Sequence, residues 1–411
     1  MSAVRDPQSA VRDPQSAVRD PQSAVRDPLS PRRVAVVHDW LIDYAGSERV
    51  VAEILRLYPQ ADLFALVDHM PPAERAPLGG RPARTTFLQR MPGVAKHLQL
   101  YLPLMPFAIE QLDVTGYDLV ISSNSAVAKG VIVSPDALHI CYLHSPMRYA
   151  HDLKFTYLAA ERGLFAAALR VVLHRLRRWD QQSAAGVDHF VAASRYTALR
   201  ARKAYRREAA AVIHPPVDTA RFTPGTTRDD YYVAVGRLMP VKRFDVLLEA
   251  FRALPERRLL VIGEGPERRR LEAMRPPNVE LAGQLDPDGV RDRVARARAF
   301  VCAGVEDFGI AAVEALACGT PVIGYRRGGV AETVAGLDAP RPTGVFYEEQ
   351  SAAALVEALR RFEAEGARIT AEACRAAALE FSPERFRARF GEFVAAAYAE
   401  WRRGSLYTPS A

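Results

Sequence analysis

The stretch AFVCAGVEDFGIAAVEALACGTPVIGY, residues 299–325, decides the fold. Its first part, AFVCAG (299–304), is a short apolar run that predicts a buried strand, and PVIGY (321–325) predicts another. Between them, GIAAVEALAC (309–318) has the length and composition of a helix. A strand, a helix and a strand in this order predict a parallel β–α–β unit, because parallel strands need a long crossover connection.

The same alternation fills the second half of the chain before this stretch. Strands are predicted at 231–236, 258–263 and 279–283, and helices at 244–254, 264–274 and 290–297. Such an alternation is typical of a doubly wound α/β sheet, which binds ligands at the carboxyl ends of its strands.

The first half repeats this pattern more loosely. VAVVH (34–38) predicts a strand, a polar loop with Gly46 follows, and VVAEILRLY (50–58) predicts a helix. Further strands are predicted at 62–67, 118–123, 139–144 and 189–194. The proline-rich segment 214–224 separates the halves. The predicted fold class is therefore α/β, with two Rossmann-like doubly wound domains facing across a cleft.

The N-terminus is a tandem repeat. SAVRDPQ occurs at 2–8, 9–15 and 16–22, and SAVRDPL follows at 23–29. A proline in every unit excludes a coiled coil, so we expect a disordered tail over 1–31, with a short recognition element as the alternative. The remaining boundaries are predicted at 32–218 for the first domain, 219–385 for the second, and 386–411 for a C-terminal helix packing back on the first domain, with its tail.

Composition limits the class of protein. The chain has 411 residues, of which 49% are apolar and 25% charged, as expected for two globular domains. We find neither an apolar run long enough to cross a membrane nor an apolar signal segment, which favours a cytoplasmic protein. The four cysteines have no metal-ligand spacing and are predicted to be reduced.

Charge is concentrated in one segment. The formal net charge is +7, and residues 161–210 hold eleven Lys or Arg against four Asp or Glu. A local basic patch predicts an anionic partner such as phosphates or acidic lipid. Nucleic acid is not favoured, because aromatic residues are sparse there and no known binding motif occurs.

Two glutamates form the strongest chemical pattern. Glu306 follows the strand predicted at 299–304, and Glu314 lies eight residues later, about one turn into the next helix. A helix N-terminus offers free amides to a diphosphate, whereas carboxylates suit the hydroxyl groups of a sugar and a ribose. The alternative is a surface acid followed by a helix-capping acid.

Other polar residues are predicted at the same edge of the second sheet. Arg237 and Lys242 follow its first strand and could clamp a pyrophosphate, or could be solvated surface cations. Gly263 and Glu264 follow the next strand in a tight turn, and Gly283 with Gln284 follows the third. Each pattern alone is weak, but successive strand ends would bring them to one ligand.

His144 is the candidate in the first half. It ends a predicted strand in YLHSPMRY (142–149) and would face the cleft, where it could bind a sugar hydroxyl. A structural histidine is the alternative.

In combination these segments resemble glycosyltransferase family 4, which has the GT-B fold, from Arg33 to about Arg403. The resemblance rests on VHDWL…YAGSERVV, YLHSPMRY, FVAASRYTALRARKAY, VIHPPVDTARF, VGRLMPVKRFDVLLEAF, VIGEGPERRRLE and EDFGIAAVEALACGTPVIGYRRGGVAETV. VHDWL, HSPMRY and EDFGI resemble the branch that contains bacterial O-antigen and exopolysaccharide mannosyltransferases.

The resemblance implies a role for each site residue. Arg237 and Lys242 would bind the donor diphosphate, Glu306 the donor hexose and Glu314 the ribose, with His144 near the donor sugar. The catalytic set is thus Glu306, His144, Arg237 and Lys242. The donor-binding set adds Gly46 in a loop over the phosphates, the amides of Phe308, Gly309 and Ile310, and Gly263, Glu264, Gly283, Gln284 and Glu314.

The resemblance also implies the reaction. Members transfer a hexose with retention of configuration and need neither metal nor cofactor. GDP-mannose is the first candidate donor, and UDP-glucose or another nucleotide sugar is the alternative. The acceptor would be a glycan or a polyprenyl-diphosphate-linked oligosaccharide in cell-surface polysaccharide synthesis. In this chain AGSER has one glycine where relatives often have two, and Ala193 stands where many have Asn.

A helix predicted at 164–179 concerns the acceptor side. Phe165, Leu169, Val172, Leu176 and Trp179 recur at helical spacing, with basic residues between them. This stripe could lie on the anionic inner face of the plasma membrane, or pack into the core with a solvated basic face.

Two rival classes of protein remain. One is a nucleotide-sugar epimerase, which lacks the combination of the diphosphate clamp, Arg237 and Lys242, with the paired glutamates, and the other is a non-catalytic sugar-binding protein.

Overall fold

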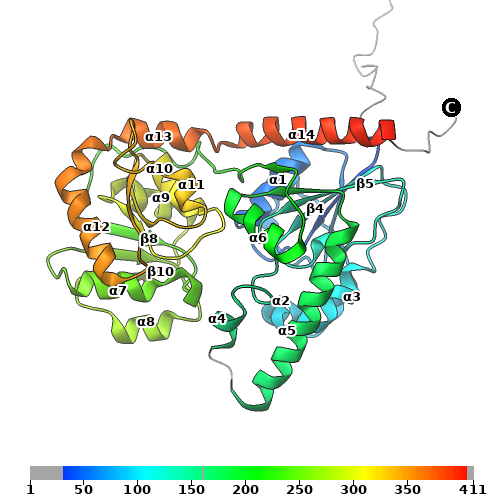
Figure 1. The fold of residues 1–411 in the computed structure, drawn as a ribbon, viewed down its shortest axis with the longest axis horizontal. Coiled ribbons are helices and arrows are strands. Elements are labelled where there is room, and N and C mark those ends of the chain that lie inside the picture. The colour runs from blue at the N-terminus through cyan, green and yellow to red at the C-terminus, as the bar shows by residue number, and fades with distance from the viewer. Residues whose placement is uncertain (1–30, 160–161, 405–411) are drawn as a thin grey trace, which may run out of the picture.

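Two Rossmann-like domains lie side by side in the computed structural model, which describes residues 31–159 and 162–404 (Figure 1). The repeat tail predicted over 1–31 and the tail after Gly404 therefore lie almost wholly outside the described residues. The predicted fold class is confirmed.

The first domain is built on a parallel seven-stranded sheet with the order β3-β2-β1-β4-β5-β6-β7. Its strands are β1 Val34–His38, β2 Asp62–Ala65, β3 Arg84–Thr85, β4 Leu119–Asn124, β5 Leu138–Leu143, β6 His189–Ala192 and β7 Ala211–Val212. Its helices are α1 Gly46–Leu57, α2 Val94–His97, α3 Met105–Ile109, α4 Lys154–Leu158, α5 Gly163–Ser183 and α6 Arg195–Tyr205.

The second domain has a parallel six-stranded sheet with the order β10-β9-β8-β11-β12-β13. Its strands are β8 Tyr232–Val235, β9 Leu259–Ile262, β10 Val279–Gly283, β11 Phe300–Cys302, β12 Val322–Tyr325 and β13 Gly344–Tyr347. The helices are α7 Phe244–Arg252, α8 Arg268–Met274, α9 Pro287–Arg296, α10 Ile310–Ala317, α11 Val330–Thr333, α12 Ala352–Glu365 and α13 Ala371–Leu379.

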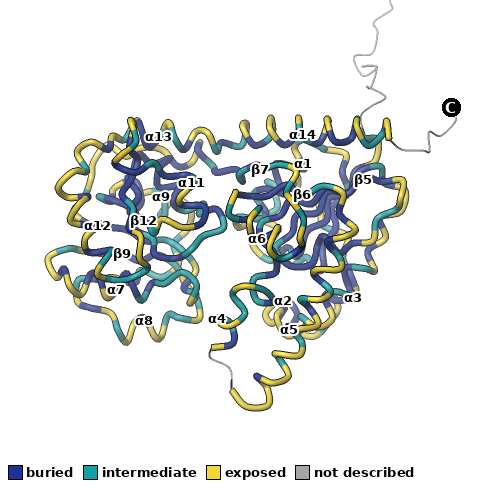
Figure 2. Tube along the Cα trace, in the orientation of Figure 1, coloured by how far each residue is buried: buried dark blue, intermediate teal, exposed yellow. Residues whose placement is uncertain are grey.

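Both faces of the first sheet are covered. Successive residues of β1 point to opposite faces, so Val34 and Val36 belong to one apolar cluster and Ala35 and Val37 to another. Figure 2 shows this burial as dark strands in the interior of the domain. Near-continuous apolar runs such as VAVVH follow from burial on both faces.

Helix α14, Pro383–Gly404, connects the domains. It follows the last helix of the second domain and runs along the first (Figure 1). Its apolar side, with Phe386, Phe390 and Val394, is part of the apolar core formed by β1 and α1. The C-terminal helix therefore adds buried surface to the first domain and links it to the second.

The topology fixes where ligands can bind. The strand order reverses between β1 and β4 in the first sheet, and between β8 and β11 in the second. In doubly wound sheets the crevice outside the carboxyl ends at this switch point is the binding site. The loops after β1, β4, β8 and β11 are therefore the places to search.

Candidate active site

A cleft of about 590 Å³ lies between the domains, within the size range of small-molecule sites. Both domains line it. The first contributes Gly46, Arg49, His144 and Arg148, and the second contributes Lys242, Gln284, Glu306, Asp307, Phe308, Gly309, Ile310 and Glu314.

Glu306 stands on a loop whose main chain is tightly held. Strand β11 ends at Cys302, so Glu306 lies four residues beyond the strand. It forms a parallel bridge with Gly328, and Gly329 N donates to Glu306 O at 2.8 Å. A Cβ on Gly329 would lie 2.3 Å from the Cα and O of Phe308, so only glycine fits there. The glycine pair 328–329 thus fixes the loop, a role not predicted from the sequence.

Lys242 contacts Glu306 directly. The ammonium Nζ lies 2.6 Å from each carboxylate oxygen. Lys242 ends a short 3₁₀ turn, Pro240–Lys242, and Gly304 lets this turn approach closely because a Cβ there would lie 2.9 Å from the Cα of Lys242. The sequence places Lys242 at the diphosphate, whereas in the structure its charge is balanced by Glu306. Both interpretations bring the two residues into one site.

Glu314 is paired across the cleft. It lies in α10, and Arg49 Nη1 of α1 donates to its Oε1 at 2.6 Å. Arg49 was missed by sequence reasoning, although it ends the quoted segment AGSER. No local pattern could predict a partner 265 residues away. This ion pair joins the two domains at the cleft.

Asp307 forms a second contact between the domains. Arg148 Nη2 lies 2.8 Å from its Oδ2, and Arg200 donates to its Oδ1. Ser194, the N-cap of α6, also donates to the carbonyl of Asp307. Part of the predicted basic patch therefore binds a carboxylate of this chain. Since Asp307 follows Glu306, these contacts also position the glutamate.

Glu332 completes the domain contact. Its carboxylate accepts from the amides of Arg195 and Tyr196, each at 2.8 Å, at the N-terminus of α6. A carboxylate at a helix N-terminus is favoured by the free amides and the helix dipole. Sequence reasoning missed this residue, because the helix it caps belongs to the other domain.

The N-terminus of α10 faces the same cleft. Gly309 precedes the helix with φ 90°, a left-handed conformation that L-residues rarely adopt. Phe308, Gly309 and Ile310 all line the cleft, as the sequence predicts for the diphosphate site. The first amides of a helix have no intrahelical partner and can bind an anion.

His144 lines the cleft from the first domain. Its Nε2 lies 2.8 Å from Ser123 Oγ, and its ring stacks edge-on against Tyr142 with centroids 5.0 Å apart. Burial lowers the pKa of His144 to about 3, so the ring is neutral at physiological pH. The predicted position in the cleft and the alternative structural role therefore both hold for this side chain.

Gly46 differs from its predicted place in a polar loop. It is the first residue of α1, which begins four residues before the predicted helix at 50–58. The helix starts early because Glu48 accepts from the amide of Ala45 at 3.1 Å and caps its first turn. A Cβ on Gly46 would lie 2.7 Å from Ile310 Cδ1, so this glycine permits close approach of the two domains.

The three other strand ends are only partly in the cleft. Gln284 and Gly236 line it, but Gly263, Glu264 and Gly283 do not. A Cβ on Gly263 would lie 2.1 Å from Gly236 O, so this glycine serves main-chain packing. Helix α8 begins at Arg268, later than predicted, because the turn at 264–267 precedes it.

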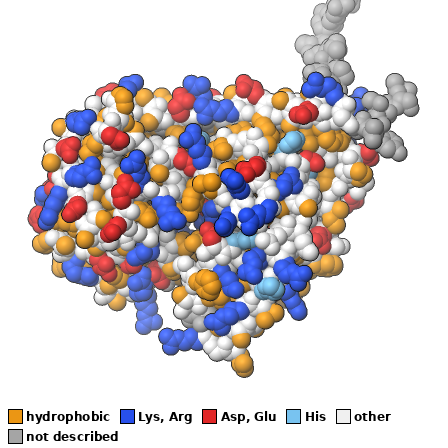
Figure 3. Space-filling view, viewed as in Figure 1, with side chains coloured by type: hydrophobic (Ala, Val, Ile, Leu, Met, Phe, Trp, Pro, Cys, Tyr) orange, Lys and Arg blue, Asp and Glu red, His pale blue; other side chains and the backbone are white. Residues whose placement is uncertain are grey.

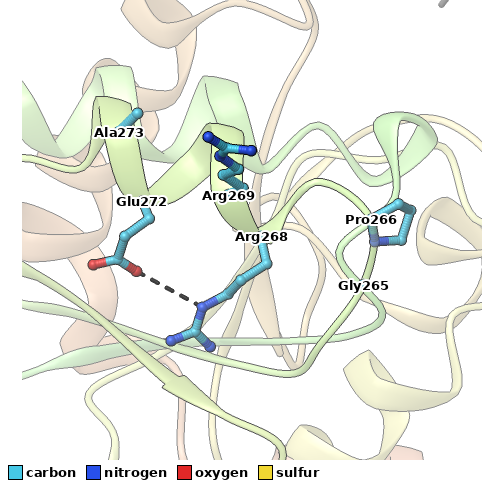
Figure 4. Close-up of a pocket in the computed structure, with 6 residues that line it drawn as sticks. All are labelled: Gly265, Pro266, Arg268, Arg269, Glu272 and Ala273. Atoms are coloured by element: carbon cyan, nitrogen blue, oxygen red, sulfur yellow. Dashed lines mark ion pairs between the residues drawn. The ribbon is translucent and has the colours of Figure 1, made fainter.

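Glu264 pairs with Arg268 at 2.8 Å. Figure 4 shows Arg268 and its second partner, Glu272, lining a separate open hollow beside α8 with Gly265 and Pro266. Glu264 is therefore engaged by its own helix.

Arg237 is exposed and forms no ion pair with any side chain in the described part of the chain. It follows β8, and its charge lowers the pKa of Asp43 in the opposite domain, although burial raises the pKa of Asp43 overall. Gly236 lines the cleft but Arg237 does not, so the predicted contact of Arg237 with the diphosphate stays a prediction.

The stripe predicted on the helix at 164–179 is mostly packed. Leu176 is buried, and Leu169, Val172 and Trp179 pack against the first domain. Phe165 differs, since 59% of it is exposed. The C-terminal three quarters of α5 therefore have the core-packed arrangement.

Basic side chains lie on the surface. Figure 3 shows Lys and Arg side chains gathered in the middle and lower part of the face drawn.

Two kinds of feature are absent from the described ranges. In residues 31–159 and 162–404, no helix is long and apolar enough to cross a membrane. The same ranges contain no cluster of His, Cys, Asp or Glu that could hold a metal ion. The predicted independence of metals and cofactors stays a prediction.

Two family models match the chain. Residues 44–221 match the one described as Glycosyltransferase Family 4, and residues 218–381 match Glycosyl transferases group 1. Together they cover both Rossmann-like domains in their order along the chain. The chain therefore belongs to the family 4 glycosyltransferases of the GT-B fold. The mannosyltransferase branch stays a prediction.

Two curated relatives share part of this sequence. D-inositol 3-phosphate glycosyltransferase of Mycobacterium sp. (strain KMS) is 39% identical over 144 residues, which are 29% of this chain and 32% of the relative. One component of the phosphatidylinositol N-acetylglucosaminyltransferase of Arabidopsis thaliana is 26% identical over 254 residues, 57% of this chain and 56% of the relative. The matches thus span about a third and just over half of these relatives.

Solved structures match over much more of the chain. Sucrose-phosphate synthase of Thermosynechococcus elongatus has a TM-score of 0.69 at 21% identity, over 90% of this chain and 99% of that one. Anabaena HepE in complex with UDP and glucose has a TM-score of 0.64 at 15% identity, over 88% and 99%. At these identities the likeness establishes the fold alone.

Proposed function

We propose that this protein transfers a hexose, with retention of configuration and without a metal ion, from a nucleoside-diphosphate sugar to a glycan or lipid-linked acceptor. One observation carries the proposal. Glu306 and Glu314 lie on either side of the N-terminus of α10, in one cleft, and each is paired with a cation. Hydroxyl-binding carboxylates beside an anion-binding helix end match the parts of a nucleotide sugar.

The residues divide the work between them. Glu306 would bind hydroxyls of the hexose, and Glu314 those of the ribose. When the sugar–phosphate bond breaks, charge grows on the leaving diphosphate. Lys242, Arg237 and the amides of α10 would stabilise this charge, in the place that a metal ion takes in other transferases.

Donor binding would therefore rearrange existing ion pairs. Lys242 Nζ holds both oxygens of Glu306 at 2.6 Å, so a hexose hydroxyl competes with it. Release of the ammonium toward the diphosphate would place its charge at the leaving group. The acceptor hydroxyl would then attack from the side that the diphosphate leaves, with a phosphate oxygen taking its proton.

The donor is proposed as GDP-mannose, on the resemblance of VHDWL, HSPMRY and EDFGI to the mannosyltransferase branch. UDP-glucose is the alternative donor. The product would enter a cell-surface polysaccharide, and the enzyme would work at the cytoplasmic side of the plasma membrane.

Contact with an anionic membrane is part of this proposal. The surface concerned is the start of α5 and the neighbouring α4, where Leu164 is 91% exposed and Phe155 and Val171 are also exposed. Figure 2 shows this end of α5 as exposed. Exposed Arg170, Arg175 and Arg178 follow along the helix, which suits insertion of apolar side chains beside anionic headgroups. Flotation with anionic liposomes, with and without salt, tests this contact.

The experiment for the main proposal is a thermal-shift panel of nucleotide sugars, followed by product analysis with the stabilising donor in EDTA. A stabilising donor whose hexose appears on an acceptor with unchanged anomeric configuration supports the proposal. Glu306→Gln should fold and give no product. The proposal would be contradicted if no nucleotide sugar stabilised the protein, or if Glu306→Gln kept full activity.

A further inference from the structure

Four polar side chains form a continuous chain from the N-terminus of α1 to the cleft. His38 Nε2 lies 3.0 Å from Glu48 Oε1, and His38 Nδ1 lies 3.1 Å from Ser123 Oγ. Ser123 Oγ in turn lies 2.8 Å from His144 Nε2. Glu48, His38 and Ser123 are buried, whereas His144 lines the cleft. Because each contact between two of these side chains holds a single hydrogen, one fixed end determines the direction of the whole chain.

The Glu48 end is fixed as an acceptor. Its Oε1 also accepts from Ser47 Oγ at 3.0 Å, and its Oε2 accepts from the amide of Ala45 at 3.1 Å. Burial alone would raise the pKa of Glu48, but the hydrogen bond and charge of His38 hold it below its usual value. An ionised carboxylate has no hydrogen to donate. His38 therefore carries a hydrogen on Nε2.

The second ring nitrogen of His38 faces two oxygens of Ser123. Nδ1 lies 3.2 Å from the carbonyl oxygen and 3.1 Å from the hydroxyl. A carbonyl oxygen can only accept, so an unprotonated Nδ1 would set two lone pairs against each other. Burial opposes a charged ring, yet Glu48 and Asp39 raise the pKa of His38 above its usual value. His38 is thus an imidazolium that donates to Glu48 and to Ser123.

The Ser123 hydroxyl then has one hydrogen and one place to donate it. Since His38 Nδ1 donates toward Ser123, that hydrogen goes to His144 Nε2. The His144 ring is neutral, so its hydrogen must be on Nδ1. Nδ1 has no hydrogen-bond partner in the described part of the chain. The charged groups near this ring are His38, Glu48 and Arg148, and none of them forms a hydrogen bond with it.

We propose that Glu48, His38 and Ser123 act as positioning residues that hold His144 in the Nδ1–H tautomer, so that its ring donates a hydrogen bond into the cleft. A ring nitrogen that already carries hydrogen cannot accept a proton, so His144 binds an oxygen of the donor sugar and is not a general base. The identity of that oxygen rests on the proposed function, whereas the tautomer does not.

The tautomer can be measured without any substrate. Long-range ¹H–¹⁵N correlation spectra of the full, uniformly ¹⁵N-labelled chain report which nitrogen of each histidine ring carries hydrogen. The His144 signals are assigned by their loss in His144→Asn. We expect hydrogen on Nδ1 and a bare Nε2 for His144, and hydrogen on both nitrogens of His38. Hydrogen on Nε2 of His144, or a neutral His38, would overturn the proposal.

Variants of Ser123 test the relay itself. Ser123→Ala should give a mixture of His144 tautomers and lower kcat by about threefold to tenfold, the effect of one hydrogen bond, with nucleotide affinity retained. Ser123→Thr keeps a hydroxyl and should restore both. Ser122→Ala is the matched control. Ser122 precedes Ser123 in β4, and its hydroxyl makes a contact of the same length, 2.8 Å, with Nε2 of His139, away from the cleft.

The two readouts separate two kinds of failure. If Ser123→Ala leaves the tautomer of His144 unchanged, the relay is wrong. If the tautomers follow the expectation but no nucleotide sugar is turned over by the wild-type chain, the proposed function is wrong and the relay stands.

Discussion

Arg49→Met tests whether the ion pair across the cleft competes with the donor. Arg49 Nη1 lies 2.6 Å from Glu314 Oε1, and the side chains are 25% and 10% exposed. Unit charges about 4 Å apart attract by about 4 kcal/mol at an effective dielectric constant near 20. Desolvation cancels much of this attraction, which leaves about 1–2 kcal/mol for a partly buried pair. A ribose that takes Glu314 must overcome this amount.

Removing Arg49 should therefore tighten donor binding. A gain of about 1–2 kcal/mol corresponds to a dissociation constant about 5-fold to 30-fold lower. Isothermal titration calorimetry with UDP and GDP measures the change. Arg56→Met is the matched control on the same helix, since Arg56 pairs with Glu53 of α1.

The sign of the change decides the role of Arg49. Weaker binding by Arg49→Met would mean that Arg49 itself holds the donor, and unchanged binding would mean that Glu314 can serve both partners. Either result refutes the competition. Glu314→Gln should bind nucleotide more weakly whether or not Arg49 is present.

Three further perturbations probe the same cleft and its support. Lys242→Met should lower kcat by about a hundredfold or more with little change in thermal stability, because it removes a cation that would stabilise the negative charge on the leaving diphosphate. A near-normal kcat would exclude that role for Lys242. Gly329→Ala places a Cβ 2.3 Å from main-chain atoms of the loop that carries Glu306, so the rate of transfer should fall about a hundredfold. The control is Gly186→Ala, whose Cβ would meet no described atom within 4 Å and which should leave the rate unchanged. Equal activity of both variants would contradict the geometry. Burial lowers the pKa of His139 from 6.5 to about 4, so the unfolded chain binds a proton that the folded chain does not, and stability should fall by about 3 kcal/mol as pH drops across this range. Urea unfolding at several pH values should show a shallower acid slope in His139→Gln; an unchanged slope would assign it to other groups.

The sequence by itself determined the fold and the edge at which the site lies. Runs such as VAVVH (34–38) and LLVI (259–262) are buried on both faces of a parallel sheet, so they are continuously apolar and easily found. Since all strands of a doubly wound sheet end at one edge, residues that follow them must come together there. Glu306, Glu314, Lys242, Gln284 and His144 were predicted at the cleft on this ground and line it.

Only the tertiary structure decided which charges are paired, because such pairs join positions far apart in the chain. Lys242 bonds to Glu306 from another loop, and Arg49 reaches Glu314 from the other domain. The start of α1 at Gly46 depends on the Glu48 cap and on room beside Ile310. Local patterns contain the period of helices and strands, whereas the partner of a charged side chain is set by how the two domains meet.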